Sequence, residues 1–290
     1  MRRISMAAAA LVALALIASA CGGASNAPES GAGEAGAVLV AAKKTTEAGS
    51  SKIAMTADFK AGETSFSMSG EGAFDYAEHA GRMTFKLIGD EIPEAFSGYE
   101  MIFTSGVVYM RFPDEFSQFL PGLKPWIKMD LEELAKQSEL NLPGFNSFTN
   151  QDPTSTLAFM RGAKDVKAEG KESIRGEVTT HYTMTIDLKE AVAEFPEEAR
   201  AGLEDLIEKT GLTEIPMETW IDGDDRVRRM RFSMDLSAIG EIAGGVEPGQ
   251  AGVMTIGMDL FDFGADVDVA APAPDQTSDY AELAKLGSGG

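Results

Sequence analysis

The chain has 290 residues, a hydrophobic fraction of 44% and a formal net charge of −21, with one Cys and two His. The length allows one large domain or two small ones, and the apolar content is sufficient for a buried core. The acidity argues against a nucleic-acid-binding protein, and the few Cys and His argue against a zinc cage or an internal disulfide. We therefore expect no nucleic-acid partner, no metal and no cofactor.

The first twenty residues have the pattern of a secretory signal peptide. Arg2 and Arg3 precede an apolar run over 4–20, which ends in small residues directly before Cys21. This arrangement resembles a bacterial lipobox, in which the Cys thiol receives a diacylglycerol and the leader is cut before it. We predict lipidation at Cys21, so that two or three acyl chains, palmitate among them, anchor the chain to the membrane. The alternatives are a secreted protein with a stray Cys and a retained transmembrane anchor.

Composition divides the rest of the chain into three parts. Residues 21–36 are rich in Gly, Ala, Ser and Glu, which predicts a flexible tether. Residues 37–269 are interpreted as one domain. Near the start of residues 270–290, Pro272 and Pro274 interrupt regular structure, so we expect a flexible C-terminal tail.

The hydrophobic period gives the elements in chain order. Residues 37–48 have helical spacing, and from Ile53 the period changes to two. Short turns separate strands expected at 53–59, 66–74, 83–87, 99–103 and 108–112, which predicts an antiparallel meander. A strand at 126–129 leads to helices at 131–138, from Asp152-Pro153 onward, and at 188–208, where Pro196 ends or kinks the helix. Further strands are expected at 166–174, 178–187, 215–221, 227–236 and 254–260.

Ten or eleven strands with one apolar and one polar face need a cover on the apolar side. We therefore predict an α+β fold, in which a strongly curved antiparallel sheet forms half a barrel and helices cover its concave face.

Methionine is frequent on the inward-facing positions of these strands. Met is unbranched and adaptable, so a Met-lined surface suits flexible apolar ligands, although ordinary core filling gives the same pattern. The inward residues of the long strands are the candidate lipid-binding residues: Met55, Phe59, Met68, Phe85, Met101, Met110, Met184, Phe232, Met234 and Met258.

Residue types that often carry catalysis have simpler explanations here. No G-x-S-x-G motif is present, and His181 lies on the polar side of its strand, which indicates a surface His. Residues 222–225 lack the spacing of a calcium loop and predict a solvated hairpin turn, with Gly223 supplying a positive φ. Trp126 and Trp220 are expected to pack in the core or at a cavity rim. We predict no catalytic residues and no enzymatic activity.

Three stretches of sequence resemble a known family. They are residues 107–113 with 126–130, residues 157–188, and residues 216–222 with 226–229. Their order and spacing resemble the LppX/LprAFG-type lipoproteins of the actinobacterial cell envelope, which share a LolA-like fold. The resemblance implies a half-barrel whose cavity, under covering helices, holds acyl chains of lipids or glycolipids. It also implies carriage or presentation of these lipids between membrane layers, and it maps Cys21 as the lipidation site.

The functional hypothesis is a monomeric lipoprotein, anchored to the outer face of the cell membrane, that binds lipid or glycolipid acyl chains. The alternative is an envelope interaction module that uses the same fold to bind a protein partner. The acidic helix expected at 188–208 is the feature that favours this alternative.

Overall fold

The computed structural model describes residues 33–61, 64–89, 97–104, 106–115, 122–130, 157–193, 195, 197–235, 252–280 and 283. Cys21, the helix expected at 131–138, the helix start at Asp152-Pro153 and Pro196 lie outside these residues, and their predictions remain untested.

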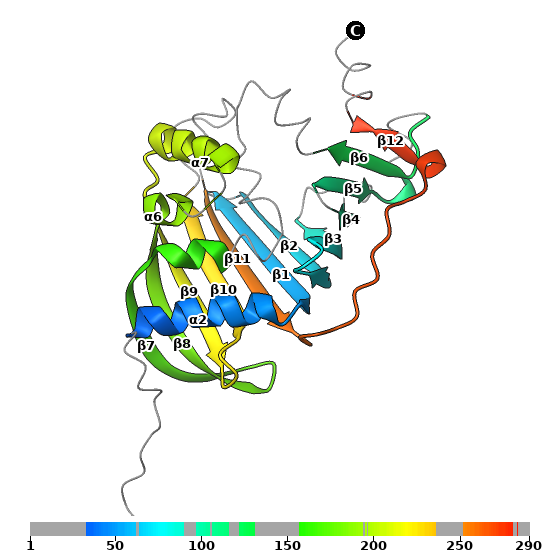
Figure 1. The fold of residues 1–290 in the computed structure, drawn as a ribbon. Helices are drawn as coiled ribbons and strands as arrows, with labels where there is room; N and C mark the ends of the chain where they lie inside the picture. The colour runs from blue at the N-terminus through cyan, green and yellow to red at the C-terminus, as the bar shows by residue number, and fades with distance from the viewer. Residues whose placement is uncertain are drawn as a thin grey trace, which may run out of the picture. The chain divides into compact units, whose positions relative to one another are not determined.

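Twelve strands form a single sheet (Figure 1) in the order β12-β6-β5-β4-β3-β2-β1-β11-β10-β9-β8-β7. Their bounds are β1 Ser50–Ala61, β2 Thr64–Asp75, β3 Ala80–Ile88, β4 Gly98–Thr104, β5 Val107–Arg111, β6 Trp126–Asp130, β7 Ala163–Ile174, β8 Glu177–Asp187, β9 Glu214–Asp222, β10 Val227–Asp235, β11 Val253–Phe261 and β12 Thr277–Asp279. The two strand series that the sequence predicts meet where β1 pairs with β11, which joins Met55 to Met258 across just over two hundred residues of chain.

The sheet is antiparallel except at β12, which pairs in parallel with β6. The edge strands β12 and β7 do not pair with each other, so the sheet is curved and unclosed. These features confirm the predicted fold class. The interpretation of 270–290 as a tail without regular structure differs from the structure at Thr277–Asp279, because these residues complete the edge of the sheet.

The described helices, apart from η4 beside β12, lie over one part of the sheet (Figure 1). They are α2 Glu34–Glu47, η3 Met160–Gly162, α6 Leu188–Ala193, α7 Glu197–Thr210 and η4 Pro274–Gln276. The first three contact β7, β8 and β10 (Figure 1). The single helix expected at 188–208 is two helices, since α6 ends at Ala193 and α7 begins at Glu197, and α2 begins three residues inside the predicted tether. Among the described residues, no helix combines the length and apolarity needed to span a membrane.

A buried threonine fixes α2 on the sheet. The Thr45 hydroxyl donates to the Ala41 carbonyl at 2.7 Å within the helix and accepts the Val227 N–H of β10 at 2.8 Å. Thr45 and Val227 are fully buried, so this pair satisfies a strand N–H that has no access to water.

Two glycines of β2 allow close packing beside them. A Cβ on Gly70 would lie 2.4 Å from the ring of Phe85, and one on Gly72 would lie 2.0 Å from the carbonyl oxygen of Arg82. Phe85 therefore lies across Gly70 and is completely buried there. The alternating pattern of β2 contains glycines because β3 fills the space that their side chains would occupy.

Candidate functional site

The apolar face of the sheet collects the methionines of the chain. Fifteen Met are present, of which Met1 and Met6 belong to the N-terminal apolar segment. The other thirteen lie in strands on this face, or in η3 against it: Met55, Met68, Met83, Met101, Met110, Met129, Met160, Met184, Met217, Met230, Met234, Met254 and Met258. Methionine is thus confined to one side of the sheet in the described chain.

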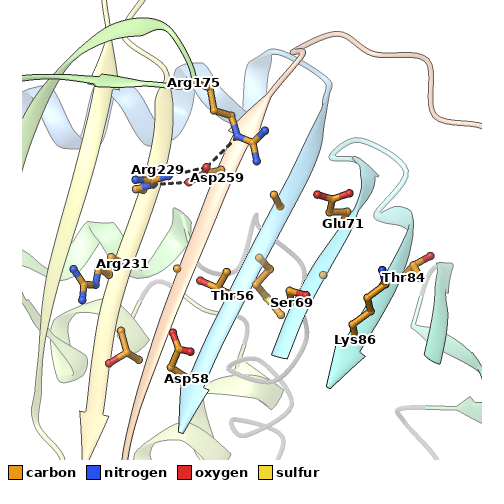
Figure 2. A pocket seen from close by; sticks show the side chains of 15 residues that line it. Thr56, Asp58, Ser69, Glu71, Thr84, Lys86, Arg175, Arg229, Arg231 and Asp259 are labelled. Carbon is orange, nitrogen blue, oxygen red and sulfur yellow. Dashed lines mark hydrogen bonds and ion pairs between the residues drawn. The ribbon is translucent and has the colours of Figure 1, made fainter. Parts of the chain in front are cut away.

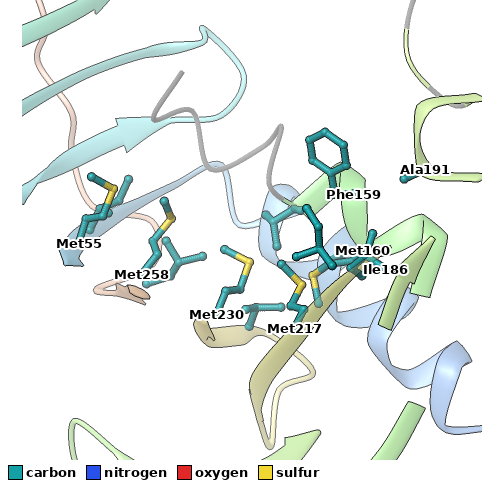
Figure 3. Packing of buried hydrophobic residues seen from close by; sticks show 14 of the residues in the cluster. Met55, Phe159, Met160, Ile186, Ala191, Met217, Met230 and Met258 are labelled. Atoms are coloured by element: carbon teal, nitrogen blue, oxygen red, sulfur yellow. The ribbon is translucent and has the colours of Figure 1, made fainter. Parts of the chain in front are cut away.

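Strand register arranges these methionines in rows. Met55, Met258 and Met230 are paired in sequence across β1, β11 and β10. Figure 3 shows this row continuing towards Met217. A second row joins Met83, Met101 and Met110 across β3, β4 and β5. The sequence places each Met on the inward side of its own strand, but only the register brings them next to one another.

The ten predicted lipid-binding residues fall into two groups of equal size. All ten lie on the apolar face, and five of them are buried in the packed core: Met55, Phe85, Met184, Met234 and Met258. The other five keep part of their side chains accessible: Phe59, Met68, Met101, Met110 and Phe232.

The partly accessible side chains gather away from the described helices. Met68, Met101 and Met110 lie on β2, β4 and β5, whereas the helices contact β7, β8 and β10. Phe59 stacks on Phe66 with 4.9 Å between ring centroids, and Phe66 is 41% exposed. The apolar face therefore has a packed part under the helices and a part, over β1–β5, with accessible apolar side chains.

The polar face has features that the sequence interpretation missed. His181 is not a plain surface residue, because its side chain is only 12% exposed. Its ring stacks on Trp220 with 4.3 Å between centroids, and its two nitrogens contact Glu172 and Glu218 at 3.2 and 3.0 Å. Trp220 is buried as predicted, but on the polar face rather than in the apolar core. The sequence pattern does not indicate this cluster. It follows from the strand register, which pairs His181 with Trp220.

The β9–β10 turn is a hairpin, as predicted, but its centre is a buried carboxylate. Asp222 accepts the backbone N–H groups of Asp224 and Arg226 at 2.9 Å and the Arg228 Nε at 2.6 Å. Burial acts to raise the pKa of Asp222, but these donors and the charge of Arg226 outweigh it, and the pKa is lowered. The predicted role of Gly223 is wrong, because Asp225 adopts the positive φ of this turn, at 58°.

A bidentate ion pair crosses β10 and β11 on the polar face. Arg229 donates from Nε and Nη2 to the two oxygens of Asp259 at 2.5 and 2.8 Å. Arg175, in the β7–β8 turn, donates from Nε to the same carboxylate at 3.0 Å. The hydrogen bonds to Asp259 raise the pKa of Arg229 against the opposing effect of its burial. Two cations thus share one carboxylate.

Comparisons with known proteins gave a sequence relative and similar solved structures. No protein-family model matches the chain. An uncharacterized 31.2 kDa protein in the rplA–rplJ intergenic region of Streptomyces griseus is 26% identical over 260 residues, which cover 84% of this chain and 78% of that protein.

Two solved structures, the first of them a lipoprotein, are similar to this one. LppX of Mycobacterium tuberculosis matches over 81% of this chain and 99% of its own, with 15% identity and a TM-score of 0.45. LprF from Mycobacterium bovis matches over 83% of this chain and 97% of its own, with 14% identity and a TM-score of 0.45.

Proposed function

We propose that this chain is a cell-envelope lipoprotein that binds acyl chains of lipids or glycolipids on the apolar face of its sheet. In this proposal Cys21 carries the membrane anchor on the outer face of the cell membrane, and the domain carries or presents its lipid between membrane layers. The protein acts as a monomeric binding protein and not as an enzyme.

The observation that carries the proposal is the confinement of methionine to one face of the sheet. An ordinary core needs shapes that fill space in one arrangement, and Leu, Ile and Val supply these. Met side chains have three rotatable bonds and a polarisable sulfur, so rows of them adapt to chains of different length and curvature. Each methylene that an acyl chain buries against such a surface contributes about 0.8 kcal/mol.

Accessibility narrows the proposed contact surface. The buried residues Met55, Phe85 and Met184 already fill the core beneath their neighbours. Acyl chains would therefore contact the partly accessible side chains over β1–β5, with Met68, Met101 and Met110 at the centre and Phe59 at one end. Phe232 on β10 would border this surface through its pairing with Ile256 of β11.

The acidity of the chain fits a ligand held by its tails. Loss of Arg2 and Arg3 with the leader makes the mature chain more negative by two charges. A strongly negative surface repels anionic lipid head groups, so the free energy of binding would come from the apolar part of the lipid.

Lipid extraction tests the proposal directly. The full chain is expressed in a bacterial host that processes lipoproteins, and bound lipid is identified by native mass spectrometry; uptake of cis-parinaric acid is then followed by fluorescence. We expect co-purified lipid and saturable uptake. Recovery of lipid-free protein that also takes up no fatty acid would refute the proposal.

A matched pair of variants locates the binding surface. Met110→Gln and Tyr109→Gln change adjacent residues of β5 that point to opposite faces of the sheet. We expect Met110→Gln to weaken fatty-acid uptake about tenfold, which is the factor expected for about 1.4 kcal/mol. Tyr109→Gln should leave uptake within twofold, and equal weakening by both variants would count against the apolar face.

The proposed anchor has its own test. Cys21→Ser removes the only thiol of the chain and with it the acceptor for a diacylglycerol. The unmodified chain should sediment with the membranes of a fractionated bacterial lysate. The N-terminus of the Cys21→Ser chain should lack the added mass of a lipid. An unchanged N-terminal mass in the two chains, apart from the substitution itself, would exclude lipidation.

A further inference from the structure

The polar face of the sheet is hollowed over five neighbouring strands. A hollow of about 840 Å³ extends over β10, β11, β1, β2 and β3 (Figure 2). This volume lies within the range of small-molecule sites, roughly 300–1,000 Å³. Apart from Met55 and Gly70, the strand residues that line it point to the face opposite to the methionines, so it is separate from the proposed acyl-chain surface.

Strand register explains why the hollow exists. One row across the five strands contains, in order, Arg231, Gly257, Thr56, Ser69 and Lys86. Three short residues form the centre of this row, and a long cation stands at each end. Neighbouring strands lie about 4.8 Å apart, so the two cations start from backbones roughly 19 Å apart. The short residues form the floor, and the long side chains form two walls.

The arginines at one side of the hollow, Arg175, Arg229 and Arg231, include guanidinium N–H groups that are available to a ligand. Asp259 is only 13% exposed and is occupied by Arg229 and Arg175, as Figure 2 shows. Arg175 uses only Nε in this contact. Its two terminal nitrogens donate no hydrogen bond to the residues that the structure describes, although its guanidinium lies over the ring of Phe261, 4.0 Å from the centroid. Arg231 lies 4.0 Å from Glu218 and is 56% exposed, and a pair of this kind holds its partners weakly. A ligand anion can therefore attract these guanidinium groups without breaking a strong contact.

The opposite wall and the floor offer acceptors and hydroxyl groups. Glu71 and Lys86 have no ion-pair partner within the described chain. Asp58 lines the hollow and accepts a hydrogen bond from Ser67 at 2.6 Å through one of its two carboxylate oxygens. The hydroxyls of Thr56, Ser69, Thr84 and Thr255 also line it. Such a lining suits a ligand with several hydroxyl groups, because carboxylates only accept and hydroxyls both donate and accept.

The local charge is much less negative than the charge of the whole chain. The lining contains four cations, Arg175, Arg229, Arg231 and Lys86, and three carboxylates, Asp58, Glu71 and Asp259. At physiological ionic strength, exposed charges more than about 8 Å away are largely screened. Glu218, 4.0 Å from Arg231, balances the excess of one cation in this lining, so the hollow is close to neutral on a chain of charge −21, with the arginines on one side and Asp58 and Glu71 on the other.

We propose that this hollow binds a phosphorylated polyol. The anion would lie between Arg231 and the free nitrogens of Arg175, since guanidinium groups match the geometry of phosphate oxygens. The hydroxyl groups of the ligand would bind Asp58, Glu71 and the hydroxyls of the floor. The same chemistry occurs in a soluble sugar phosphate and in the head group of a phosphoinositide-type lipid.

Calorimetric titration of the full chain with inositol 1-phosphate tests this site. We expect saturable binding with a Kd below about 1 mM at low salt, weakened at least fivefold in 0.5 M NaCl because exposed charge pairs are screened. Unphosphorylated inositol should bind at least tenfold more weakly. Absence of binding at 10 mM ligand, or equal affinity for both compounds, would overturn the proposal.

Two arginines in similar surroundings provide the control. Arg231 and Arg82 both lie on the polar face, are 56% and 55% exposed, and face a glutamate, but only Arg231 lines the hollow. Arg231→Gln should weaken inositol 1-phosphate binding at least fivefold, and Arg82→Gln should leave it within twofold. Lys86→Gln should also weaken it, with thermal unfolding monitored in every variant. Equal effects of Arg231→Gln and Arg82→Gln would show that only the net charge matters.

Vesicles distinguish the two sources of the ligand. Phosphatidylcholine vesicles with and without 10% phosphatidylinositol are compared for the unmodified and the Arg231→Gln chains. Extra binding to the phosphatidylinositol vesicles that Arg231→Gln removes assigns the hollow to a lipid head group. Binding of inositol 1-phosphate without this difference assigns it to a soluble or polymer-linked polyol phosphate. Neither result depends on fatty-acid uptake, so this proposal and the acyl-chain proposal can fail separately.

Discussion

The imidazole of His181 and the indole of Trp220 lie parallel, 4.3 Å apart and with 4° between their planes, on the polar face of adjacent strands. Glu172 joins the pair from β7, because it contacts His181 Nδ1 and accepts the Trp220 Nε1 hydrogen bond at 2.9 Å. This cluster ties the edge strand β7 to β8 and β9. It buries an aromatic pair on a face that otherwise carries charged side chains.

Trp220→Phe tests the hydrogen-bonded part of this cluster. Phe keeps a ring under His181 but removes the indole N–H that Glu172 accepts. We expect the free energy of unfolding to fall by about 1 kcal/mol in urea denaturation, the usual contribution of one hydrogen bond. Glu172→Gln is the control, since its amide oxygen still accepts the bond. A Trp220→Phe chain as stable as the unmodified one would contradict this account.

Asp222 gives the hairpin a defined pH dependence. Its pKa is lowered in the folded chain, so the folded state favours the ionised carboxylate. Its contribution to stability is complete above the unfolded pKa of about 3.9 and is lost as the pH falls through the lower folded pKa. Asp222→Asn should cost about 2 kcal/mol at pH 7, because a buried charge-assisted set of hydrogen bonds is weakened.

The difference between Asp222→Asn and the unmodified chain should shrink below about pH 3.9 and vanish below the folded pKa. Asp224→Asn is the control, since the Asp224 side chain is 74% exposed. Urea unfolding between pH 2.5 and 7 measures both differences. A constant difference over this range would show that Asp222 does not act through its charge.

The close approach of β3 to the glycines of β2 predicts an order of stability. In Gly70→Ala the new methyl group meets the ring of Phe85, a side chain that can move, whereas in Gly72→Ala it meets the backbone carbonyl of Arg82. We expect Gly72→Ala to be the more destabilising, with costs of about 1–3 kcal/mol for overpacking.

Gly223→Ala is a matched control for the glycine variants. Gly223 has open space around its Cβ position and no positive φ, so the change should stay within about 0.5 kcal/mol. A large loss in Gly223→Ala, or a smaller loss in Gly72→Ala than in Gly70→Ala, would contradict the packing described.

Lys124 holds the C-terminal strand at the edge of the sheet. Its ammonium group donates to the carbonyls of Pro274 and Thr277 at 3.1 and 2.9 Å, and its backbone N–H donates to the Ser278 hydroxyl. Lys124→Met removes the two ammonium contacts. We expect amide exchange in Thr277–Asp279 to accelerate about fivefold, as for a loss of about 1 kcal/mol in local stability.

Hydrogen exchange measured by mass spectrometry detects this change in β12. Lys43→Met is the control, because Lys43 pairs with Glu47 on α2 and touches neither β6 nor β12. Unchanged exchange in β12 after Lys124→Met would show that the strand pairing alone holds this segment.

Local periodicity was sufficient for most of the fold. Alternation in segments such as 53–59 and 254–260 placed the strands and their apolar sides correctly, because side chains alternate between faces with a period of two in any strand. It failed at Thr277–Asp279, a three-residue strand after a proline-rich stretch, since this strand depends on its pairing with β6 and on hydrogen bonds from Lys124, which are contacts between segments distant in sequence. It also failed for Gly223, because the turn is shaped by the hydrogen bonds of Asp222.

The sequence by itself determined which side chains lie on each face of the sheet, with the methionines on one face and the charged side chains on the other. It also placed a single Cys after an apolar leader. Only the tertiary structure decided which of these side chains lie next to one another. Met55 reaches Met258, and Arg175 reaches Asp259, through pairings between distant segments. The physical reason is that the direction of a side chain is set by its own strand, whereas its neighbours are set by the order and register of strands.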